Sequence, residues 1–289
     1  MRFVIIASRR TGSSHLVNTL SGHPEIFCHG NIFASGMMAV FWPKGERPPG
    51  DTVKRLKADL RSLRSESPEK FLERAYALDH GRPHVGFKIF PGQHDEILEA
   101  LLDDAAVRKV ILFRRNILAS YSSTVAARDS GTWGIEKGSD LPPIPKVQFD
   151  EDHFLRYWEK FIGWYDHAIE RLNARRQTFH LVHYEDINDP ALLSAAVNFV
   201  GADGSRPIVE VIQRKQQIKL NSNDIPGRFA DPGRVLDFLR QRGLMHWAYE
   251  GESSLSALAG EPAPKPLAVP ARCESLGGEG VRRSTITPG

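Results

Sequence analysis

Short apolar runs alternate with helical periods along this chain, and the alternation constrains the fold more than any other feature of the sequence. The runs are rich in β-branched and aromatic residues and are followed by polar residues, as is typical of strands. They cover residues 3–8, 85–90, 107–114 and 178–184. Strands separated by helices predict an α/β fold in which a mostly parallel central sheet is covered by helices on both faces.

Helical periods fill the intervals between these runs. The clearest covers residues 153–172, where Phe154, Trp158 and Phe161 begin an apolar stripe with three- and four-residue spacing. Further helices are expected over residues 13–20 and 69–78, around residues 97–102, and from Asp189 and Pro190 to a stop at Gly201.

The chain is long enough for one large core, because 41% of its 289 residues are hydrophobic. Residues 1–250 are therefore expected to form one domain. Residues 251–289 are rich in Ala, Pro, Gly and Ser, which predicts a disordered tail. Residues 131–147 lack any period and are expected to form a surface loop that could lie over a site.

Composition argues against several classes of protein. A balance of 38 basic and 35 acidic residues gives a net charge of +3, which does not indicate nucleic acid as the main partner. Cys28 and Cys273 lie far apart, so neither a disulfide framework nor a zinc site is indicated. The sequence shows no run of about 18 apolar residues and no signal peptide, so we expect a cytoplasmic protein without an integral membrane segment.

The first motif with chemical meaning is RRTGSSHL at residues 9–16, which joins the first predicted strand to a helix. A tight turn at Gly12 would direct several backbone N–H groups toward one point, where the helix dipole favours an anion. Arg10 adds positive charge, and further donors come from the hydroxyl groups of Thr11, Ser13 and Ser14. The alternative is that Ser13 only caps the helix. The motif lacks the GKS or GKT sequence of a nucleotide triphosphatase.

The second motif, FRRNILASYSS at residues 113–123, follows the third predicted strand. Arg114 and Arg115 lie where that strand should end, and Asn116 is suited to cap a following helix. Arg115 and Ser123, eight residues apart, could hold one phosphate if the helix bends back over the site. The alternative is a charged strand end followed by small helical residues.

Two further groups of polar residues lie in or after predicted strands. Lys88 interrupts the apolar sequence GFKIF, where a cation is costly unless it is paired or directed toward a polar site. It is a candidate contact for a reacting group; the alternative is a strand with Lys88 on its wet face. The residues of HYED, His183 to Asp186, follow the last predicted strand, where open α/β sheets place ligands, or they cap the next turn.

Taken together, these motifs resemble the sulfotransferases, which use 3′-phosphoadenosine 5′-phosphosulfate (PAPS) as the sulfuryl donor. RRTGSSHL is similar to the 5′-phosphosulfate loop of that family, and FRRNILASYSS to its 3′-phosphate motif. CHGNIF at residues 28–33, VGFKIF at 85–90 and HYEDI at 183–187 extend the likeness over roughly residues 1–245. The chain most resembles bacterial members that sulfate carbohydrates or glycolipids, which implies a P-loop-kinase-like three-layer fold.

The resemblance also implies roles for individual residues. Arg10, Thr11, Gly12, Ser13 and Ser14 would bind the 5′-phosphosulfate, whereas Arg115 and Ser123 would bind the 3′-phosphate. The sulfuryl group would pass in line to an acceptor hydroxyl, with Arg10 and Lys88 as catalytic candidates. No metal is expected, since arginine and backbone donors can stabilise the charge on the leaving phosphate.

The base that takes the hydroxyl proton is not evident. Many related bacterial enzymes read CHGEIF, in which the glutamate is a natural base, whereas this chain has Asn31, whose amide cannot accept a proton at neutral pH. Three accounts compete. His29 is the base, or Asn31 orients the acceptor while a carboxylate from elsewhere acts, or the enzyme is slow or inactive.

Other functions stay open on the sequence alone. A nucleotide or sugar kinase would share the sheet and the anion loop, and a catalytically degraded nucleotide-binding protein would share the phosphate sites. The acceptor is expected to be a small molecule or a glycan, by family analogy only. Arg214, Lys215 and Lys219 could reach the 3′-phosphate or the acceptor, or could form a solvated helix face. The oligomeric state is not indicated.

Overall fold

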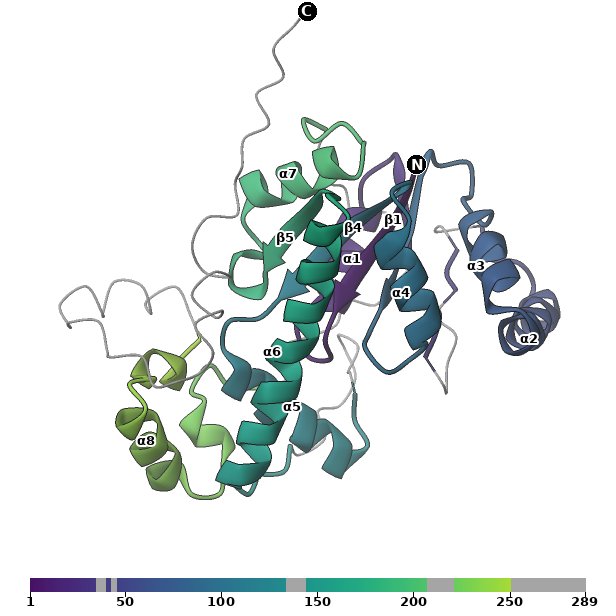
Figure 1. Cartoon of the computed structure of the whole chain (residues 1–289). Coiled ribbons are helices and arrows are strands. Elements are labelled where there is room, and N and C mark those ends of the chain that lie inside the picture. Colours follow the sequence, from purple (N-terminus) through teal and green to yellow (C-terminus); the bar gives the residue numbers. More distant parts are fainter. Residues whose placement is uncertain (35–39, 43–45, 134–143, 207–220, 251–289) are drawn as a thin grey trace, which may run out of the picture.

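Five short strands form one parallel sheet in the order β2-β3-β1-β4-β5. The computed structural model describes residues 1–34, 40–42, 46–133, 144–206 and 221–250 (Figure 1). The strands are β1 (Arg2–Ala7), β2 (Ile26–Asn31), β3 (His84–Ile89), β4 (Val107–Phe113) and β5 (Phe179–His183). The four strands expected from the apolar runs are confirmed.

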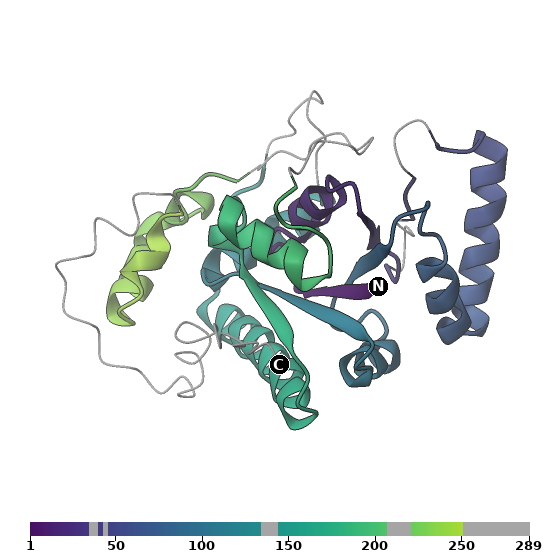
Figure 2. The same ribbon diagram turned by 90° about the horizontal axis from the view of Figure 1, so that it is seen from above.

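The central strand β1 shows why the sheet is covered on both faces. Phe3, Ile5 and Ala7 pack against α1 (Ser13–Ser21) and α7 (Pro190–Phe199) in one apolar cluster. Val4 and Ile6 belong to a second cluster, to which α3 (Pro68–Tyr76), α4 (Asp95–Asp103), α5 (Ile117–Ser130) and α6 (Glu151–Ala174) contribute. Figure 2 shows α1 and α7 on one side of the sheet and α4 and α6 on the other. The predicted three-layer α/β architecture is confirmed.

The edge strand β2 was not predicted. Its sequence IFCHGN begins with an apolar pair but continues through His, Gly and Asn, which disfavour a strand. Pairing with β3 imposes the strand conformation, and the register shifts between Cys28 and Asn31. The first five residues of β2 are buried, so tertiary contacts override weak local preference.

Predicted helices are confirmed with small changes at their ends. The helix expected at residues 153–172 is α6, which starts at Glu151 because the Asp150 carboxylate accepts a hydrogen bond from the His153 N–H. Asn116 caps α5 in the same way through the N–H of Ala119. Among the described residues, the α-helices α2 (Gly50–Glu66) and α8 (Pro232–Gln241) were not predicted. In α2 only Val53 and Leu60 are buried, so its apolar stripe is weak.

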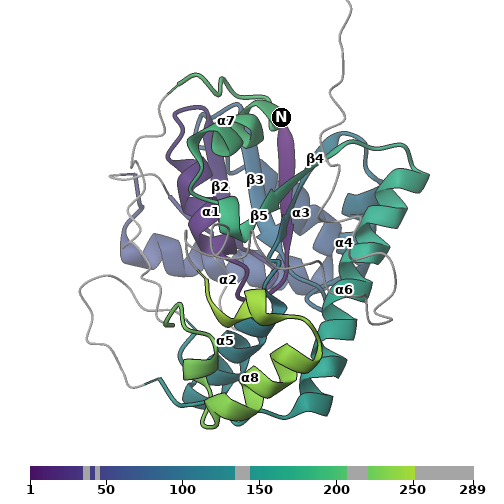
Figure 3. The same ribbon diagram turned by 90° about the vertical axis from the view of Figure 1, so that its left-hand side faces the viewer.

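The described part of the chain after residue 220 packs against the start of α6 and against α5 (Figure 3). Phe229, Phe238 and Trp247 meet Phe149, Phe154 and Trp158 in an aromatic cluster. Residues 221–250 therefore belong to the same core as the sheet. The expected tail at residues 251–289 lies outside the described residues, as do Arg214, Lys215 and Lys219 and most of the loop expected at 131–147.

No helix among the described residues is long and apolar enough to cross a membrane.

Candidate functional site

The turn between β1 and α1 presents an open helix start. Gly12 occupies the N-cap position of α1, and within the described residues no side chain caps the helix there. The alternative in which Ser13 only caps the helix is therefore wrong. Arg10 and Gly12 both have left-handed backbone angles, with φ of 62° and 81°. The first N–H groups of α1 thus have no capping side chain, as an anion-binding turn requires.

Gly12 is required by space as well as by conformation. A Cβ atom at this position would lie 2.6 Å from the ring of Tyr184, which follows β5. Thr11 is fully buried, and its hydroxyl donates to the carbonyl of Ser8 at 2.7 Å. Thr11 therefore shapes the turn from within.

Lys88 reaches this turn from β3. Its ammonium group donates to the hydroxyl oxygens of Ser13 at 3.2 Å and of Ser14 at 2.7 Å. Only 7% of the lysine is exposed, so the alternative that it lies on a wet strand face is wrong. The structure therefore brings Lys88, Ser13 and Ser14 together, although Lys88 is distant from the serines in sequence.

Asn31 lies beside Lys88 at the end of β2. The two residues are paired in the parallel register of β2 and β3. The Asn31 side-chain oxygen is buried and has no hydrogen-bond partner among the described residues. Since a buried acceptor of this kind is costly, a group bound beside Lys88 would satisfy it.

Ser123 joins α5 to the turn. Its hydroxyl oxygen accepts one bond from Arg10 Nε at 2.7 Å and another from Asn221 Nδ2 at 2.9 Å. A hydroxyl has two acceptor sites and one donor, so the Ser123 O–H remains able to donate to a ligand. Arg10 also donates to the carbonyl of Trp133 at 2.6 Å. The pKa of Arg10 is lowered, mainly by burial and to a smaller extent by the positive charge of Arg114.

Arg115 forms an ion pair with Asp186. Its guanidinium donates to Asp186 at 3.0 Å and its side chain is 45% exposed. The carboxylate of Glu185 accepts the backbone N–H groups of Arg115 and Asn116 at 3.0 and 3.2 Å, so the HYED segment caps the start of α5. The structure brings Ser123 to Arg10, and it records no contact between Ser123 and Arg115 among the described residues.

His29 lies between β2 and the end of α3. It is fully buried, and its Nε2 lies 3.1 Å from the carbonyls of both Ala75 and Leu78 at the end of α3. Its Nδ1 accepts the N–H of Phe41 at 3.4 Å. Both ring nitrogens are therefore engaged, which favours a packing role over that of a base. His183 is also unsuited, because burial and the charge of Arg115 lower its pKa to about 4.

The sequence analysis missed a buried ion cluster formed by Arg114, Arg228 and Glu250. The Glu250 carboxylate accepts two bonds from Arg114, at 2.8 and 2.5 Å, and one from Arg228 at 3.3 Å. Each of the three side chains is at most 7% exposed. The double arginine of FRRN was the only signal in the sequence, and it could not indicate the carboxylate of Glu250.

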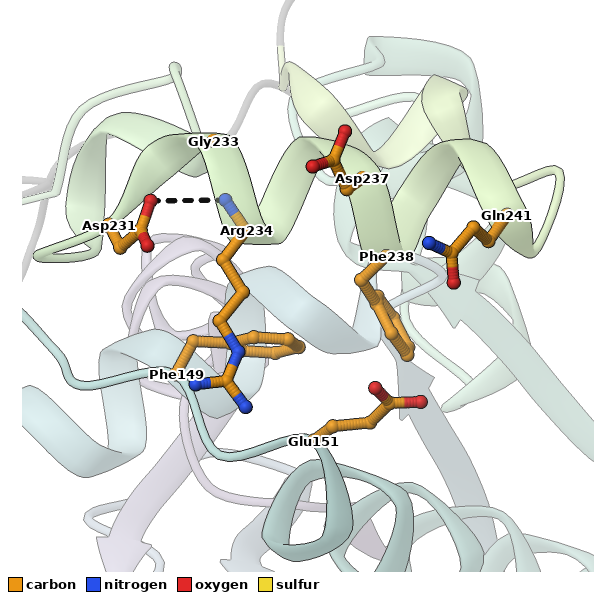
Figure 4. A pocket seen from close by; sticks show the side chains of 8 residues that line it. All are labelled: Phe149, Glu151, Asp231, Gly233, Arg234, Asp237, Phe238 and Gln241. Atoms are coloured by element: carbon orange, nitrogen blue, oxygen red, sulfur yellow. Dashed lines mark hydrogen bonds between the residues drawn. The ribbon is translucent and has the colours of Figure 1, made fainter.

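A separate hollow of about 460 Å³ lies between α8 and the start of α6 (Figure 4). It is lined by Phe149, Glu151, Asp231, Gly233, Arg234, Asp237, Phe238 and Gln241. None of the predicted site residues is among them. Glu151 and Asp237 form ion pairs with Arg242 and Arg240, so the hollow has no excess of cations with which to bind a phosphate or sulfate. The turn at Gly12, beside Arg10 and Lys88, is the better anion site. Within the described ranges, no cluster of three or more His, Cys, Asp or Glu residues could hold a metal ion.

Comparison with known proteins gives the following relatives. No family model matches the chain. It is 26% identical over 222 residues to nodulation protein H of Rhizobium meliloti strain 1021, covering 75% of this chain and 84% of that protein. It is 28% identical over 213 residues to nodulation protein H of Rhizobium tropici, covering 71% and 77%.

Two solved structures that are similar to this chain are the following. The sulfotransferase from Alicyclobacillus acidocaldarius has a TM-score of 0.45 and 16% identity, covering 86% of this chain and 98% of that one. The sulfotransferase domain from the curacin biosynthetic pathway has a TM-score of 0.41 and 12% identity, covering 96% of each chain. Both of these proteins are named as sulfotransferases, the family that the motifs of this chain resemble.

Proposed function

We propose, from this resemblance to the sulfotransferases, that the chain transfers a sulfuryl group from PAPS to a hydroxyl group of a carbohydrate, glycolipid or other small acceptor. The observation that carries the proposal is the convergence of a buried lysine with an uncapped helix start. Lys88 donates to both Ser13 and Ser14, next to the turn formed by Arg10 and Gly12. This arrangement offers cationic, hydroxyl and backbone donors to one anion.

The residues present fit the two ends of the donor. The turn at residues 10–14 would hold the 5′-phosphosulfate with its backbone N–H groups, and the absence of a Cβ at Gly12 lets this turn pack against the ring of Tyr184. Ser123 would donate to the 3′-phosphate, and Arg115 would do so if it left Asp186. The donor supplies the sulfuryl group and a phosphate on which negative charge builds as the group departs.

Lys88 and Arg10 would stabilise that charge. Lys88 is buried and Arg10 is partly buried, and a fixed donor that is shielded from water acts more strongly than one at the surface. Because Lys88 is held by two serines of the same turn, it needs little reorganisation as the charge develops. By analogy with phosphoryl transfer, most of the acceleration would come from positioning and charge stabilisation.

On the acceptor side, we assign to Asn31 the task of orienting the hydroxyl group. Its buried oxygen, which has no partner among the described residues, would accept the hydrogen bond of the acceptor hydroxyl beside Lys88. The amide cannot take the proton, so a base other than Asn31 completes the reaction. The burial of His29 supports this account over the one in which His29 is the base.

The histidine and asparagine of β2 give opposite expected results. His29→Gln should lower the free energy of unfolding by about 1–3 kcal/mol, because buried polar groups lose partners, and should leave kcat of the folded enzyme nearly unchanged. Asn31→Ala should leave stability nearly unchanged and lower kcat by roughly tenfold or more, since an orienting contact is lost. Chemical denaturation and initial rates measure the two quantities. A loss of kcat in His29→Gln at full folding would restore His29 as the base.

Binding of the product nucleotide tests the function itself. Adenosine 3′,5′-bisphosphate at about 100 times its dissociation constant should add about 2.7 kcal/mol of stability, without added Mg²⁺. Thermal unfolding with and without the nucleotide gives this value. Stabilisation by ATP with Mg²⁺ and not by the bisphosphate would indicate a kinase. Binding of the bisphosphate without sulfate transfer to any of a broad panel of hydroxyl acceptors would indicate a non-catalytic nucleotide-binding protein.

A further inference from the structure

The buried ion cluster of Arg114, Arg228 and Glu250 lies directly behind the turn at Gly12. Arg114 Nη1 donates to the backbone carbonyl of Arg10 at 2.7 Å. The other two nitrogens of the same guanidinium, Nε and Nη2, hold the two carboxylate oxygens of Glu250. One planar group therefore fixes the turn and the carboxylate at the same time.

The bond to the Arg10 carbonyl sets the direction of a neighbouring N–H group. The peptide between Arg10 and Thr11 is planar and trans, so its C=O and N–H point in opposite directions. Holding the carbonyl toward Arg114 therefore turns the Thr11 N–H away from the cluster. Arg10 needs such support, because a non-glycine residue with φ of 62° is in a sparsely populated conformation.

Glu250 is itself held in place. Its backbone N–H donates to the carbonyl of Asn223 at 2.9 Å, and the preceding Tyr249 forms a β-bridge with Asp224. Arg228, the second arginine of the cluster, donates to the carbonyl of Ala119 and the hydroxyl of Ser122 on α5. The cluster thus links three segments: the turn after β1, the first turns of α5, and residues 222–250.

The cluster also contributes charge. It contains two guanidinium groups and one carboxylate, which leaves one excess positive charge buried near Arg10. The ring of Tyr184 lies under Arg114, 4.2 Å from the guanidinium carbon to the ring centroid, and limits its movement from that side. A surface ion pair would have neither this burial nor this number of fixed neighbours.

We propose that Arg114 and Glu250 are positioning residues, which hold the Arg10 carbonyl so that the turn presents its N–H groups to the 5′-phosphate end of the donor. The identity of that anion rests on the proposed function, whereas the positioning of the turn does not. Neither residue touches the reacting atoms in this account. The carboxyl-terminal part of the described chain thereby becomes a component of the donor site.

The test uses Arg114→Lys in the full-length protein. Lysine keeps the charge that pairs with Glu250, but a single ammonium cannot also hold the Arg10 carbonyl with the geometry of the guanidinium. Arg242→Lys is the matched control, because Arg242 forms an ion pair with Glu151 at 2.9 Å in the same region and contacts no part of the turn among the described residues.

Two nucleotides separate positioning from general loosening. Affinity for adenosine 3′,5′-bisphosphate should fall at least about tenfold in Arg114→Lys. Affinity for adenosine 3′-monophosphate, which lacks the 5′-phosphate, should stay within about twofold of the wild type, and Arg242→Lys should change neither. If Arg114→Lys bound both nucleotides equally more weakly than the wild type, or bound both with unchanged affinity, the proposal would be overturned.

A second measurement needs no ligand. Limited digestion with trypsin, followed by mass spectrometry, reports cleavage after Arg9 and Arg10, which depends on how often the turn opens. Cleavage should be at least about tenfold faster in Arg114→Lys than in Arg242→Lys. Equal rates of cleavage would refute the positioning role of Arg114.

If the wild type bound neither nucleotide, the proposed function would fail, and this digestion alone would decide whether Arg114 positions the turn. If Arg114→Lys does not fold, Glu250→Asp takes its place, because aspartate keeps the charge but its shorter side chain withdraws the carboxylate from Arg114. It should lower affinity for the bisphosphate and speed cleavage by trypsin, as expected for Arg114→Lys.

Discussion

Lys88→Met should lower kcat for sulfuryl transfer by roughly 100- to 1,000-fold, the usual cost of removing one fixed donor from a developing negative charge. Methionine has nearly the same length, so the strand should not rearrange. The protein should also lose some stability, because the hydroxyl groups of Ser13 and Ser14 lose a hydrogen-bond donor. Initial rates at saturating donor and a denaturation curve measure the two effects.

Lys109→Met is the matched control for this experiment. Lys109 is also buried in a strand, but it lies near the start of β4 and donates to the carbonyl of Asp104 and the side chain of Gln177. Its replacement should lower stability, because those acceptors lose a partner, and should leave kcat within about twofold. A similar loss of rate in both variants would mean that Lys88 supports the sheet rather than the reaction.

Gly12→Ala should both destabilise the protein and weaken nucleotide binding. The left-handed conformation should cost alanine about 1–2 kcal/mol, and the clash with the Tyr184 ring should add about 1–3 kcal/mol. The ring cannot yield freely, because it lies under Arg114. Affinity for adenosine 3′,5′-bisphosphate should fall at least about tenfold, as the turn loses its shape.

Gly81→Ala separates the two contributions. Gly81 has φ of 73°, close to that of Gly12, but a Cβ atom at Gly81 would have no other atom within 4 Å. Gly81 precedes β3, at the end of that strand opposite to Lys88. Its replacement should cost only the conformational part, about 1–2 kcal/mol, and should leave nucleotide affinity unchanged. Urea denaturation and calorimetric titration test both variants. Equal destabilisation by the two changes would rule out the steric role of Tyr184.

The sequence predicted the strands of the core because their apolar residues are β-branched and bounded by polar turns. The turn at Gly12 could also be predicted, because glycine and serine after an apolar strand indicate the start of a helix. β2 could not, because its pairing with β3 outweighs the weak preference of His29, Gly30 and Asn31 for a strand.

The prediction for FRRN depended on a choice that sequence spacing cannot make. Arg114 and Arg115 both follow the end of β4, and the spacing does not say which of the two side chains faces the turn after β1. The structure places Arg114 there, bonded to the Arg10 carbonyl, and turns Arg115 toward Asp186. The binding of the 3′-phosphate by Arg115 and Ser123 stays a prediction.

Buried polar residues were the other difficulty. The local sequence CHGNIF does not indicate whether the His29 side chain faces a ligand or the carbonyls of Ala75 and Leu78, as it does in the structure. Lys88 was easier, because a cation within GFKIF is costly without a partner. Glu250 lies 136 residues from Arg114 and 22 residues from Arg228, so no local pattern could indicate its contacts with them.

The order of the strands in the sheet has a consequence for how the protein is made. On the ribosome, β1 emerges before either of its neighbours, because the two strands that pair with it, β3 and β4, both come later in the sequence. Until those strands are synthesised, the apolar segment RFVIIA has no sheet to enter and is exposed to unwanted association. Nascent chains that stall before β4 should therefore bind chaperones through β1, and the turn at Gly12 should form only after much of the domain has left the exit tunnel.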